Sequence, residues 1–336
     1  MEGRKIIVTG SAGFIGFHLC KLLLSEGFLV HGYDGITDYY DVKLKKRRHE
    51  ILNDHPNFTS TVGMLEDQSL VDKEFSKFSP NVVIHLAAQA GVRYSLENPR
   101  AYIESNIVGT FNIMEAARKN DIKHLLMAST SSVYGANQSM PFDESNKADT
   151  QLTIYAATKK ANENMAHSYA YLHKLPTTMF RFFTVYGPWG RPDMALFKFT
   201  QQILNNDEID IYNNGDMYRD FTYVDDLVNG IKLLIDAVPE TGKSVCNTDS
   251  ISPVGPYRVV NIGNSKKIKL LDFINAIESE LDIEAKRNMM PMQIGDVKET
   301  WADVSLLEAL TGFSPNTNIN QGIKNFINWY KEYYGV

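Results

Sequence analysis

The clearest indication of the fold is the segment KIIVTGSAGFIGFHLCKLL, residues 5–23. Its apolar first part predicts a buried strand, and FIGFHLCKLL predicts a helix. Between them, Gly10, Gly13 and Gly16 follow one another at intervals of three residues. Glycines at such a turn let the backbone bend sharply, and the N–H groups at the start of the helix then face any bound anion. The stretch therefore predicts a strand, a tight turn and a helix that together can hold a phosphate group.

Further apolar runs follow at intervals of about 20 to 40 residues, which is the spacing that parallel crossovers require. They are FLVHGYD (28–34), FTSTVGM (58–64), NVVIHLAA (81–88), KHLLMAST (123–130) and, as an expected sixth strand, TTMFRFFTVYG (177–187). Near-continuous Val, Ile and Leu fits strands that are buried on both faces. The fold class predicted is α/β, with a doubly wound parallel sheet of the Rossmann type.

The regular alternation of strands and helices fades after the sixth run, where turn residues become dense. We expect one domain over 1–180 and a second, smaller C-terminal α/β lobe over 181–336. Residues 240–256 are rich in Ser, Gly and Pro and predict a surface loop. From Asn318 onward, apolar residues at helical spacing predict an amphipathic helix.

Composition excludes several classes of protein. The 336 residues include 34 basic and 40 acidic side chains, and a net charge near −6 argues against nucleic-acid binding. Two cysteines, Cys20 and Cys246, cannot form a disulfide framework or a metal site by themselves. We expect a soluble cytoplasmic protein without a metal, since neither a signal peptide nor a membrane-spanning run is recognisable.

Asp34 ends the second predicted strand, eighteen residues after Gly16. A carboxylate there can bond both hydroxyls of an adenosine ribose and would repel a 2′-phosphate, so NAD is favoured over NADP. The alternative is a purely structural unit with a solvated aspartate. The basic run from Lys43 to Arg48 could hold a 2′-phosphate, but it is more simply interpreted as the solvated face of a helix.

The motif YAATK, Tyr155 to Lys159, lies in a helical segment and places a phenol and an ammonium on one helix face. A tyrosine titrates near 10, so it acts as a base at neutral pH only if nearby positive charge lowers that value. Lys159 and an oxidised nicotinamide could both supply this charge. Thr130 would hydrogen-bond the substrate oxygen whose proton the phenol accepts.

TGSAGFIG, Asp34, HLAAQAG, STSSVYG, YAATK and RFFTVYGPWGRPDMA together resemble the extended short-chain dehydrogenase/reductase family. Within it, the chain is most similar to the nucleotide-sugar 4-epimerases, and among these to the ones that act on UDP-glucuronate. The resemblance covers essentially the whole chain, including YNNGDMYRDFTYVDD and PYRVVNIGN. It implies an NAD-binding Rossmann domain over 1–180, rejoined by part of 220–262, and an interleaved nucleotide-sugar-binding lobe over 181–336.

The resemblance implies a role for each matching residue. The catalytic residues are expected to be Thr130, Tyr155 and Lys159. NAD is expected to bind Gly10, Gly13, Phe14, Ile15, Gly16, Asp34, Leu86, Ala87, Ala88, Asn106, Ser129, Tyr155 and Lys159. The substrate is expected to bind Thr130, Ser131, Ser132, Tyr155, Thr184, Arg191 and Arg219. Met64 departs from the family pattern, because relatives often carry an aspartate there that contacts the adenine.

Four hydroxyl residues follow one another from Ser129 to Ser132, and this hydroxyl run distinguishes between reactions. Relatives that decarboxylate or dehydrate a nucleotide sugar carry an acid in this run, whereas this chain has Ser131 and Ser132. We therefore expect simple epimerisation at C4 of a UDP-sugar, with the two serines and Thr184 reading a substrate carboxylate. Asp220 and Asp225 are interpreted as structural, because a carboxylate would repel a diphosphate.

The expected reaction is the conversion of UDP-glucuronate to UDP-galacturonate through a transient 4-keto sugar. A UDP-glucose 4-epimerase and a UDP-glucuronate decarboxylase are the nearer alternatives, and a non-catalytic NAD sensor is an alternative of another class. The family usually dimerises through two helices, expected here around 106–120 and 155–172, so we also expect a homodimer.

Overall fold

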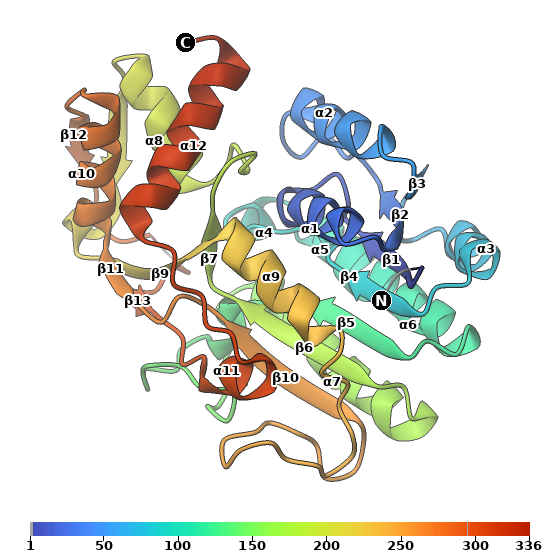
Figure 1. The fold of residues 1–336 in the computed structure, drawn as a ribbon. Coiled ribbons are helices and arrows are strands. Elements are labelled where there is room, and N and C mark those ends of the chain that lie inside the picture. The colour runs from blue at the N-terminus through green and yellow to red at the C-terminus, as the bar shows by residue number, and fades with distance from the viewer. Residues whose placement is uncertain (1–2, 294) are drawn as a thin grey trace.

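The computed structural model describes residues 3–293 and 295–336. Its main feature is a sheet of seven parallel strands in the order β10-β6-β5-β4-β1-β2-β3 (Figure 1). The strands are β1 (Lys5–Thr9), β2 (Leu29–Asp34), β3 (Phe58–Val62), β4 (Val82–His85), β5 (His124–Ala128), β6 (Thr177–Phe182) and β10 (Tyr257–Ile262). This is the predicted doubly wound Rossmann-type sheet, since the order reverses at β1 and helices cover both faces.

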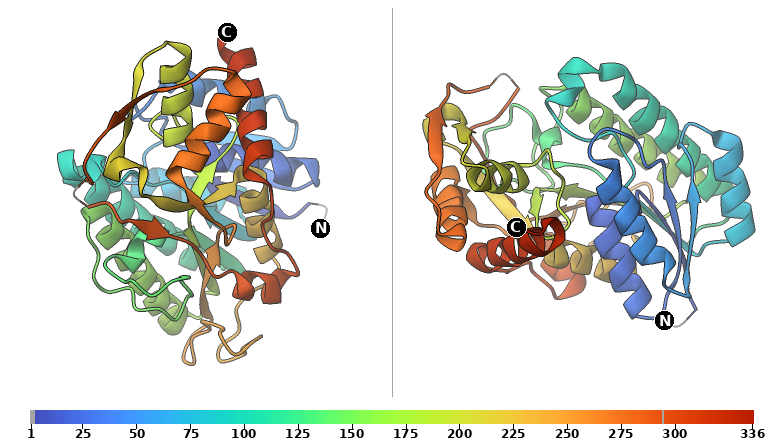
Figure 2. Two further views of the ribbon diagram at one scale, coloured as in Figure 1. Left: turned by 90° about the vertical axis from the view of Figure 1, so that its left-hand side faces the viewer. Right: turned by 90° about the horizontal axis from the view of Figure 1, so that it is seen from above.

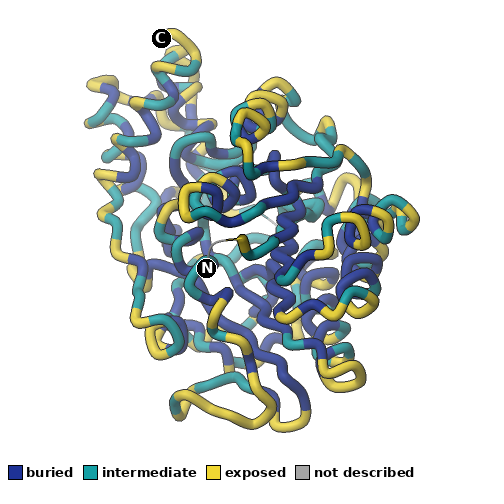
Figure 3. The backbone as a smooth tube through the Cα atoms, turned by 45° about the vertical axis from the view of Figure 1, so that its right-hand side comes forward, coloured by how far each residue is buried: buried dark blue, intermediate teal, exposed yellow. Residues whose placement is uncertain are grey.

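Helices α1, α9 and α11 cover one face of this sheet, and α3, α6 and α7 cover the other (Figures 1 and 2). The helices are α1 (Phe14–Ser25), α2 (Val42–Asn53), α3 (Gln68–Phe78), α4 (Tyr94–Glu97), α5 (Pro99–Tyr102), α6 (Thr110–Lys119), α7 (Ile154–His173), α8 (Ala195–Leu204), α9 (Val224–Leu234), α10 (Leu270–Leu281), α11 (Ser305–Thr311) and α12 (Ile319–Tyr334). The strands inside the sheet are buried on both faces, which explains their near-continuous apolar sequences, and they lie in the dark core of Figure 3. The edge strand β3 is buried only at Phe58.

The expected sixth strand is in fact two strands, which corrects the prediction. β6 belongs to the main sheet, whereas β7 (Thr184–Tyr186) pairs with β9 in a smaller sheet. The chain leaves the main sheet at Phe183, which is buried in the apolar core beside this sheet. Because one apolar run continues through both strands, the sequence did not mark the break.

The smaller sheets belong to the later part of the chain. They contain β9 (Tyr218–Tyr223), β11 (Lys267–Lys269) and β13 (Glu299–Thr300) together with β7, and a separate pair, β8 (Glu208–Ile211) and β12 (Lys286–Met289). Apolar side chains of α8, α10 and α12 form one cluster with them. In α12, Ile323, Phe326, Ile327 and Tyr330 are buried, which confirms the predicted amphipathic helix.

Side-chain caps fix where helices α2 and α7 begin. The Asp41 carboxylate accepts a hydrogen bond from the Lys43 N–H at the start of α2, and Thr153 caps α7 through the Ala156 N–H. Such caps satisfy N–H groups that have no partner within the helix. The cap at Thr153 sets the start of α7 directly before Tyr155.

The basic run on α2 is only partly solvated, which corrects its interpretation as a solvated helix face. Lys45 and Arg48 are buried, while Lys43, Lys46 and Arg47 are exposed. Residues 240–256 form the expected loop, most of which is exposed (Figure 3). In the described part of the chain, no helix is both long and apolar enough to cross a membrane.

Candidate active site

A cavity of about 630 Å³ opens at the carboxyl ends of the main-sheet strands, between these strands and the segment that follows β6. Ligands of doubly wound sheets bind at this edge, where the strand order reverses. The predicted cofactor residues that line it are Gly10, Gly13, Phe14, Ile15, Gly16, Asp34, Leu86, Ala87, Ala88, Ser129, Tyr155 and Lys159. The predicted substrate residues that line it are Thr130, Ser131, Ser132, Tyr155, Thr184 and Arg191.

The glycine-rich turn is too tightly packed for side chains. Gly10 has a φ of +75°, and a Cβ atom there would lie 2.8 Å from the Ala87 nitrogen. A Cβ atom on Gly16 would lie 2.0 Å from the Gly10 oxygen. The backbone between β1 and α1 therefore borders the cavity without side chains at these points, which is the arrangement that a dinucleotide pyrophosphate requires.

Asp34 lies at the end of β2 beside this turn. Its carboxylate accepts hydrogen bonds from the Ala12 N–H at 2.9 Å and from the Ile36 N–H at 2.8 Å. These bonds fix the carboxylate at the wall of the cavity, where it can still accept ribose hydroxyls. The glycine cradle and this carboxylate together fit NAD.

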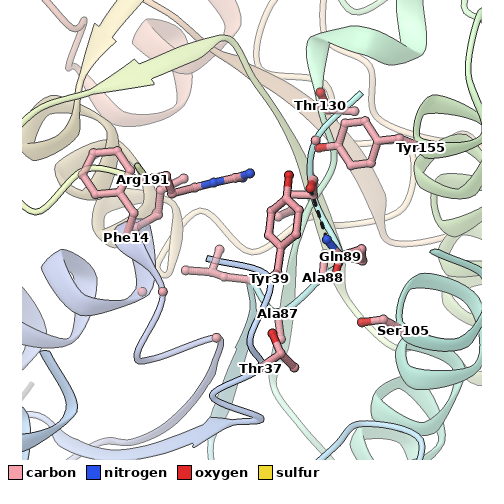
Figure 4. Close-up of a pocket in the computed structure, with 18 of the residues that line it drawn as sticks. Phe14, Thr37, Tyr39, Ala87, Ala88, Gln89, Ser105, Thr130, Tyr155 and Arg191 are labelled. Atoms are coloured by element: carbon pink, nitrogen blue, oxygen red, sulfur yellow. Dashed lines mark hydrogen bonds between the residues drawn. The ribbon is translucent and has the colours of Figure 1, made fainter. Parts of the chain in front are cut away.

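Tyr155 and Thr130 lie next to each other at one end of the cavity, and Arg191 points into it from the other side (Figure 4). Burial raises the pKa of the Tyr155 phenol above its usual 10, whereas the Thr130 hydroxyl and the Arg191 guanidinium act in the opposite direction. Lys159 is buried one helical turn after Tyr155, and its ammonium donates to the Ala128 oxygen at 3.0 Å. Burial lowers the pKa of Lys159 to about 8, so its charge is retained at neutral pH.

The four hydroxyl residues after β5 have different environments. Thr130 caps the short 3₁₀ helix Ser131–Tyr134, because its hydroxyl oxygen accepts the Ser132 N–H at 3.2 Å. Ser131 and Ser132 are partly exposed and line the cavity. The Ser129 hydroxyl instead donates to the buried Glu163 carboxylate at 2.7 Å. The cavity therefore receives hydroxyl groups from this run, and no carboxylate.

Arg191 is held by a neighbouring acid. Its Nε and Nη2 atoms donate to the Asp193 carboxylate at 3.0 and 2.6 Å, and the Tyr39 hydroxyl donates to the same group at 3.1 Å. Burial by itself lowers the pKa of Arg191, but Asp193 raises it above its usual value. Arg191 is thus a fixed positive charge at the cavity wall.

Two predicted site residues, Asn106 and Arg219, are not among the residues that line this cavity. Asn106 is fully buried, and its amide oxygen and nitrogen pair with the backbone of Gln89 at 2.8 and 3.0 Å. It therefore supports the loop after β4 and does not face the cavity itself. Arg219 lies on β9, where it donates to the Asp296 carboxylate at 2.7 Å and to the Lys298 oxygen.

Asp220 and Asp225 have structural contacts. Asp220 lies within β9 and accepts N–H groups from Asn264, Ser265 and Ala302, and burial raises its pKa to about 6. Asp225 lies in the first turn of α9 and faces His18 at 3.3 Å. Met64 lines the cavity with a partly exposed side chain, so no carboxylate lies at that position.

Several residues that line the cavity were not predicted from the sequence. They are Thr37, Tyr39, Tyr40, Lys45, Gln89, Tyr94 and Ser105. Most lie in or beside the loops that follow β2 and β4, and such loops meet at the carboxyl edge of a parallel sheet. The tyrosine-rich run DYYD after the second strand was a signal that could have identified Tyr39 and Tyr40.

These features define a dinucleotide-dependent enzyme of the extended short-chain dehydrogenase type, with a tyrosine, a lysine and a threonine around one cavity. Residues 6–263 match the NAD dependent epimerase/dehydratase family. The chain belongs to this family.

Relatives and solved structures extend this finding over the whole chain. A probable UDP-glucuronate 4-epimerase of Rhizobium meliloti is 53% identical over 98% of this chain and 98% of its own length. UDP-glucuronate 4-epimerase 1 of Arabidopsis thaliana is 42% identical over 99% of this chain and 78% of its own length. The crystal structure of UDP-glucuronic acid 4-epimerase from Bacillus cereus, in complex with UDP-glucuronic acid and NAD, has a TM-score of 0.88 at 32% identity. That match covers 98% of this chain and 100% of the other.

Proposed function

We propose that this chain is an NAD-dependent UDP-glucuronate 4-epimerase, which converts UDP-glucuronate to UDP-galacturonate. The observation that carries the proposal is the cavity wall at the end of β5, where Thr130, Ser131 and Ser132 lie beside Tyr155. The relatives in Rhizobium and Arabidopsis carry the same activity in their names, and the Bacillus cereus enzyme binds the same sugar nucleotide and NAD.

The turn from Gly10 to Gly16 would hold the NAD pyrophosphate, and Asp34 the adenosine ribose. Lys159 and the apolar segment Leu86–Ala88 would border the nicotinamide. When bound, NAD supplies a reversible acceptor for the hydride of a secondary alcohol.

Tyr155 acts as the general base in this proposal. It accepts the proton of the C4 hydroxyl as that carbon is oxidised, and it returns a proton when the ketone is reduced. Because burial raises the pKa of Tyr155, the phenolate depends on nearby positive charge for its stability. Lys159 supplies part of this charge, and Thr130 holds the reacting oxygen toward the phenol.

Ser131, Ser132 and Thr184 bind the substrate carboxylate. The 4-keto form of a uronate is a β-keto acid, which loses CO₂ readily, so the carboxylate must be held in an orientation that disfavours cleavage. Hydroxyl donors can do this without repelling the carboxylate. Arg191 anchors a second anionic part of the substrate while the keto sugar turns its other face toward the cofactor.

Two related activities remain as alternatives, a UDP-glucose 4-epimerase and a UDP-glucuronate decarboxylase. Purified protein incubated with UDP-glucuronate should yield UDP-galacturonate, and chromatography of the products distinguishes it from a decarboxylated pentose nucleotide. Turnover of UDP-glucose alone, or the pentose nucleotide as main product, would contradict the proposal. A non-catalytic NAD sensor would give no product, and it has no need of Tyr155, Lys159 and Thr130 together.

A homodimer in the cytoplasm is also part of the proposal. Large apolar side chains are exposed on the two segments expected to pair, namely Val108 and Phe111 near α6 and Tyr171 and Leu172 on α7. Covering this surface with a second copy would remove it from water. Light scattering should give twice the mass of the 336-residue chain, and a monomer at micromolar concentration would contradict this part.

A further inference from the structure

Arg48 on α2 is fully buried, although it belongs to a basic run. Its Nη1 atom donates to the Ala12 oxygen at 3.1 Å and to the Tyr40 hydroxyl at 2.8 Å. Its Nη2 atom donates to the Trp189 oxygen at 2.5 Å and to the Gly190 oxygen at 3.2 Å. One guanidinium therefore joins three loops that are far apart in the sequence.

Two of these loops carry the predicted binding groups for cofactor and substrate. Ala12 belongs to the glycine-rich turn, and its N–H is held by Asp34 at 2.9 Å while its oxygen is held by Arg48. Trp189 and Gly190 directly precede Arg191. Arg48 is thus a direct link between the turn that faces the pyrophosphate and the loop that places Arg191 at the cavity.

The loop before Arg191 needs such support. Trp189 has a φ of +59°, which is unfavourable for a residue with a large side chain. The Pro188 oxygen, next in line, lies 2.9 Å from His18 Nε2 on α1. Three consecutive carbonyl groups, from Pro188 to Gly190, are therefore bound by side chains of α1 and α2.

The chemistry of the contacts separates Arg48 from an ordinary buried ion pair. Within the part of the chain that the structure describes, no carboxylate forms a salt bridge with Arg48, and its partners are carbonyl groups and a phenol. A planar guanidinium can bond oxygens on both sides at once, whereas the ammonium of lysine is a single point of charge. The two loops are therefore held by the planar shape of the Arg48 guanidinium as well as by its charge.

We propose that Arg48 is a positioning residue that sets Arg191 for substrate binding and links it to the cofactor turn. The inference rests on the proposed function, because it takes Arg191 to be an anion-binding group. It predicts that Arg48 acts on the nucleotide sugar through Arg191. Substituting Arg48 should then change the affinity for the nucleotide sugar very little once Arg191 has also been substituted.

The test is a double-mutant cycle of UDP binding, measured by calorimetry on the enzyme with saturating NAD. UDP is used because it does not turn over. Arg48→Lys keeps the charge and should weaken the affinity for UDP about tenfold or more, as expected for a lost charge-assisted contact. Arg191→Met should weaken UDP to a similar extent. The double variant should bind UDP within about twofold of Arg191→Met.

Arg47→Lys is the matched control, since Arg47 is the exposed neighbour on the same helix and should leave UDP affinity unchanged. Normal UDP affinity in Arg48→Lys would overturn the inference, and so would losses that multiply in the double variant. If Arg48→Lys does not fold, His18→Ala removes one of the three carbonyl contacts and should give a smaller loss that also disappears beside Arg191→Met. Failure of the unmodified enzyme to bind UDP would overturn the proposed function as well, so the two failures are distinguishable.

Discussion

Glu163 offers the sharpest stability prediction, because it is a buried carboxylate directly behind the hydroxyl run. Its carboxylate accepts hydrogen bonds from Nε and Nη2 of Arg181, each at 2.9 Å. It also accepts hydrogen bonds from the Ser129 hydroxyl at 2.7 Å and the Lys160 ammonium at 2.9 Å. The Glu163 and Arg181 side chains are only 2% and 3% exposed. Substituting glutamine keeps the size of the side chain but leaves Arg181 without a buried counter-charge.

The expected loss in the free energy of unfolding can be worked out in two ways. Breaking one partner of a buried ion pair costs about 3–5 kcal/mol. Burial by itself raises the pKa of Glu163, but the hydrogen bonds and charge of Arg181, with Lys160 and Ser129, lower it from 4.5 to about 2. That shift corresponds to about 3 kcal/mol in favour of the ionised, folded form. Glu163→Gln should therefore lower the free energy of unfolding by about 3–5 kcal/mol.

Guanidinium denaturation of Glu163→Gln, of the unmodified chain and of Lys160→Met provides the measurement. Lys160 is partly exposed, so its loss should cost less than about 1 kcal/mol. Because the pKa of Glu163 is lower in the folded state, its contribution is complete above pH 4.5 and declines as the pH falls toward 2. The difference between the unmodified chain and Glu163→Gln should shrink by about 1 kcal/mol between pH 7 and pH 3.5. A loss below about 1 kcal/mol at pH 7, or a difference that does not change with pH, would show that the ionised Glu163 carboxylate does not stabilise the fold as a buried partner of Arg181.

Four further predictions concern the site. Tyr155→Phe should lower kcat by about a hundredfold or more in steady-state assays, with little change in UDP affinity, and near-normal turnover would exclude Tyr155 as the base. Lys159→Met should move the rising limb of the pH–activity profile to higher pH, since the phenolate loses a nearby charge; an unshifted profile counts against this role. Replacing Ser131 and Ser132 with alanine should weaken the binding of UDP-glucuronate by about 1.5–3 kcal/mol for each lost charge-assisted hydrogen bond and increase the decarboxylated by-product. An equal loss of affinity for UDP-glucose would refute carboxylate binding by the two serines. Asp34→Ala should reduce the NAD content of purified protein, measured after denaturation, and an unchanged content would refute the ribose assignment.

The sequence was sufficient for the parts of the fold that depend on local pattern. The strand, glycine turn and helix at the N-terminal end and the parallel strands follow from periodicity and from the spacing of Gly10, Gly13 and Gly16. Tyr155 and Lys159 could be paired in advance because a spacing of four places them on one helix face.

Other features depend on tertiary contacts that no local pattern reveals. Arg48 lies in a run that looks solvated, and only the approach of the loop at Trp189 supplies acceptors for it. The position of Arg219 is decided by its ion pair with Asp296, which is distant in the sequence. Asn106 carries an amide that the family pattern assigned to the cofactor, but the backbone of Gln89 satisfies it first.

Whether the chain epimerises C4 by oxidation and reduction can be measured by following the hydrogen at that carbon. UDP-glucuronate deuterated at C4 is incubated with the enzyme in ordinary water, and the product is analysed by mass spectrometry and NMR. UDP-galacturonate should retain the deuterium at C4, because the hydride leaves and returns within the same cavity, and no net NADH should accumulate. Loss of the deuterium to water, or its appearance in released NADH, would contradict epimerisation through a bound 4-keto sugar.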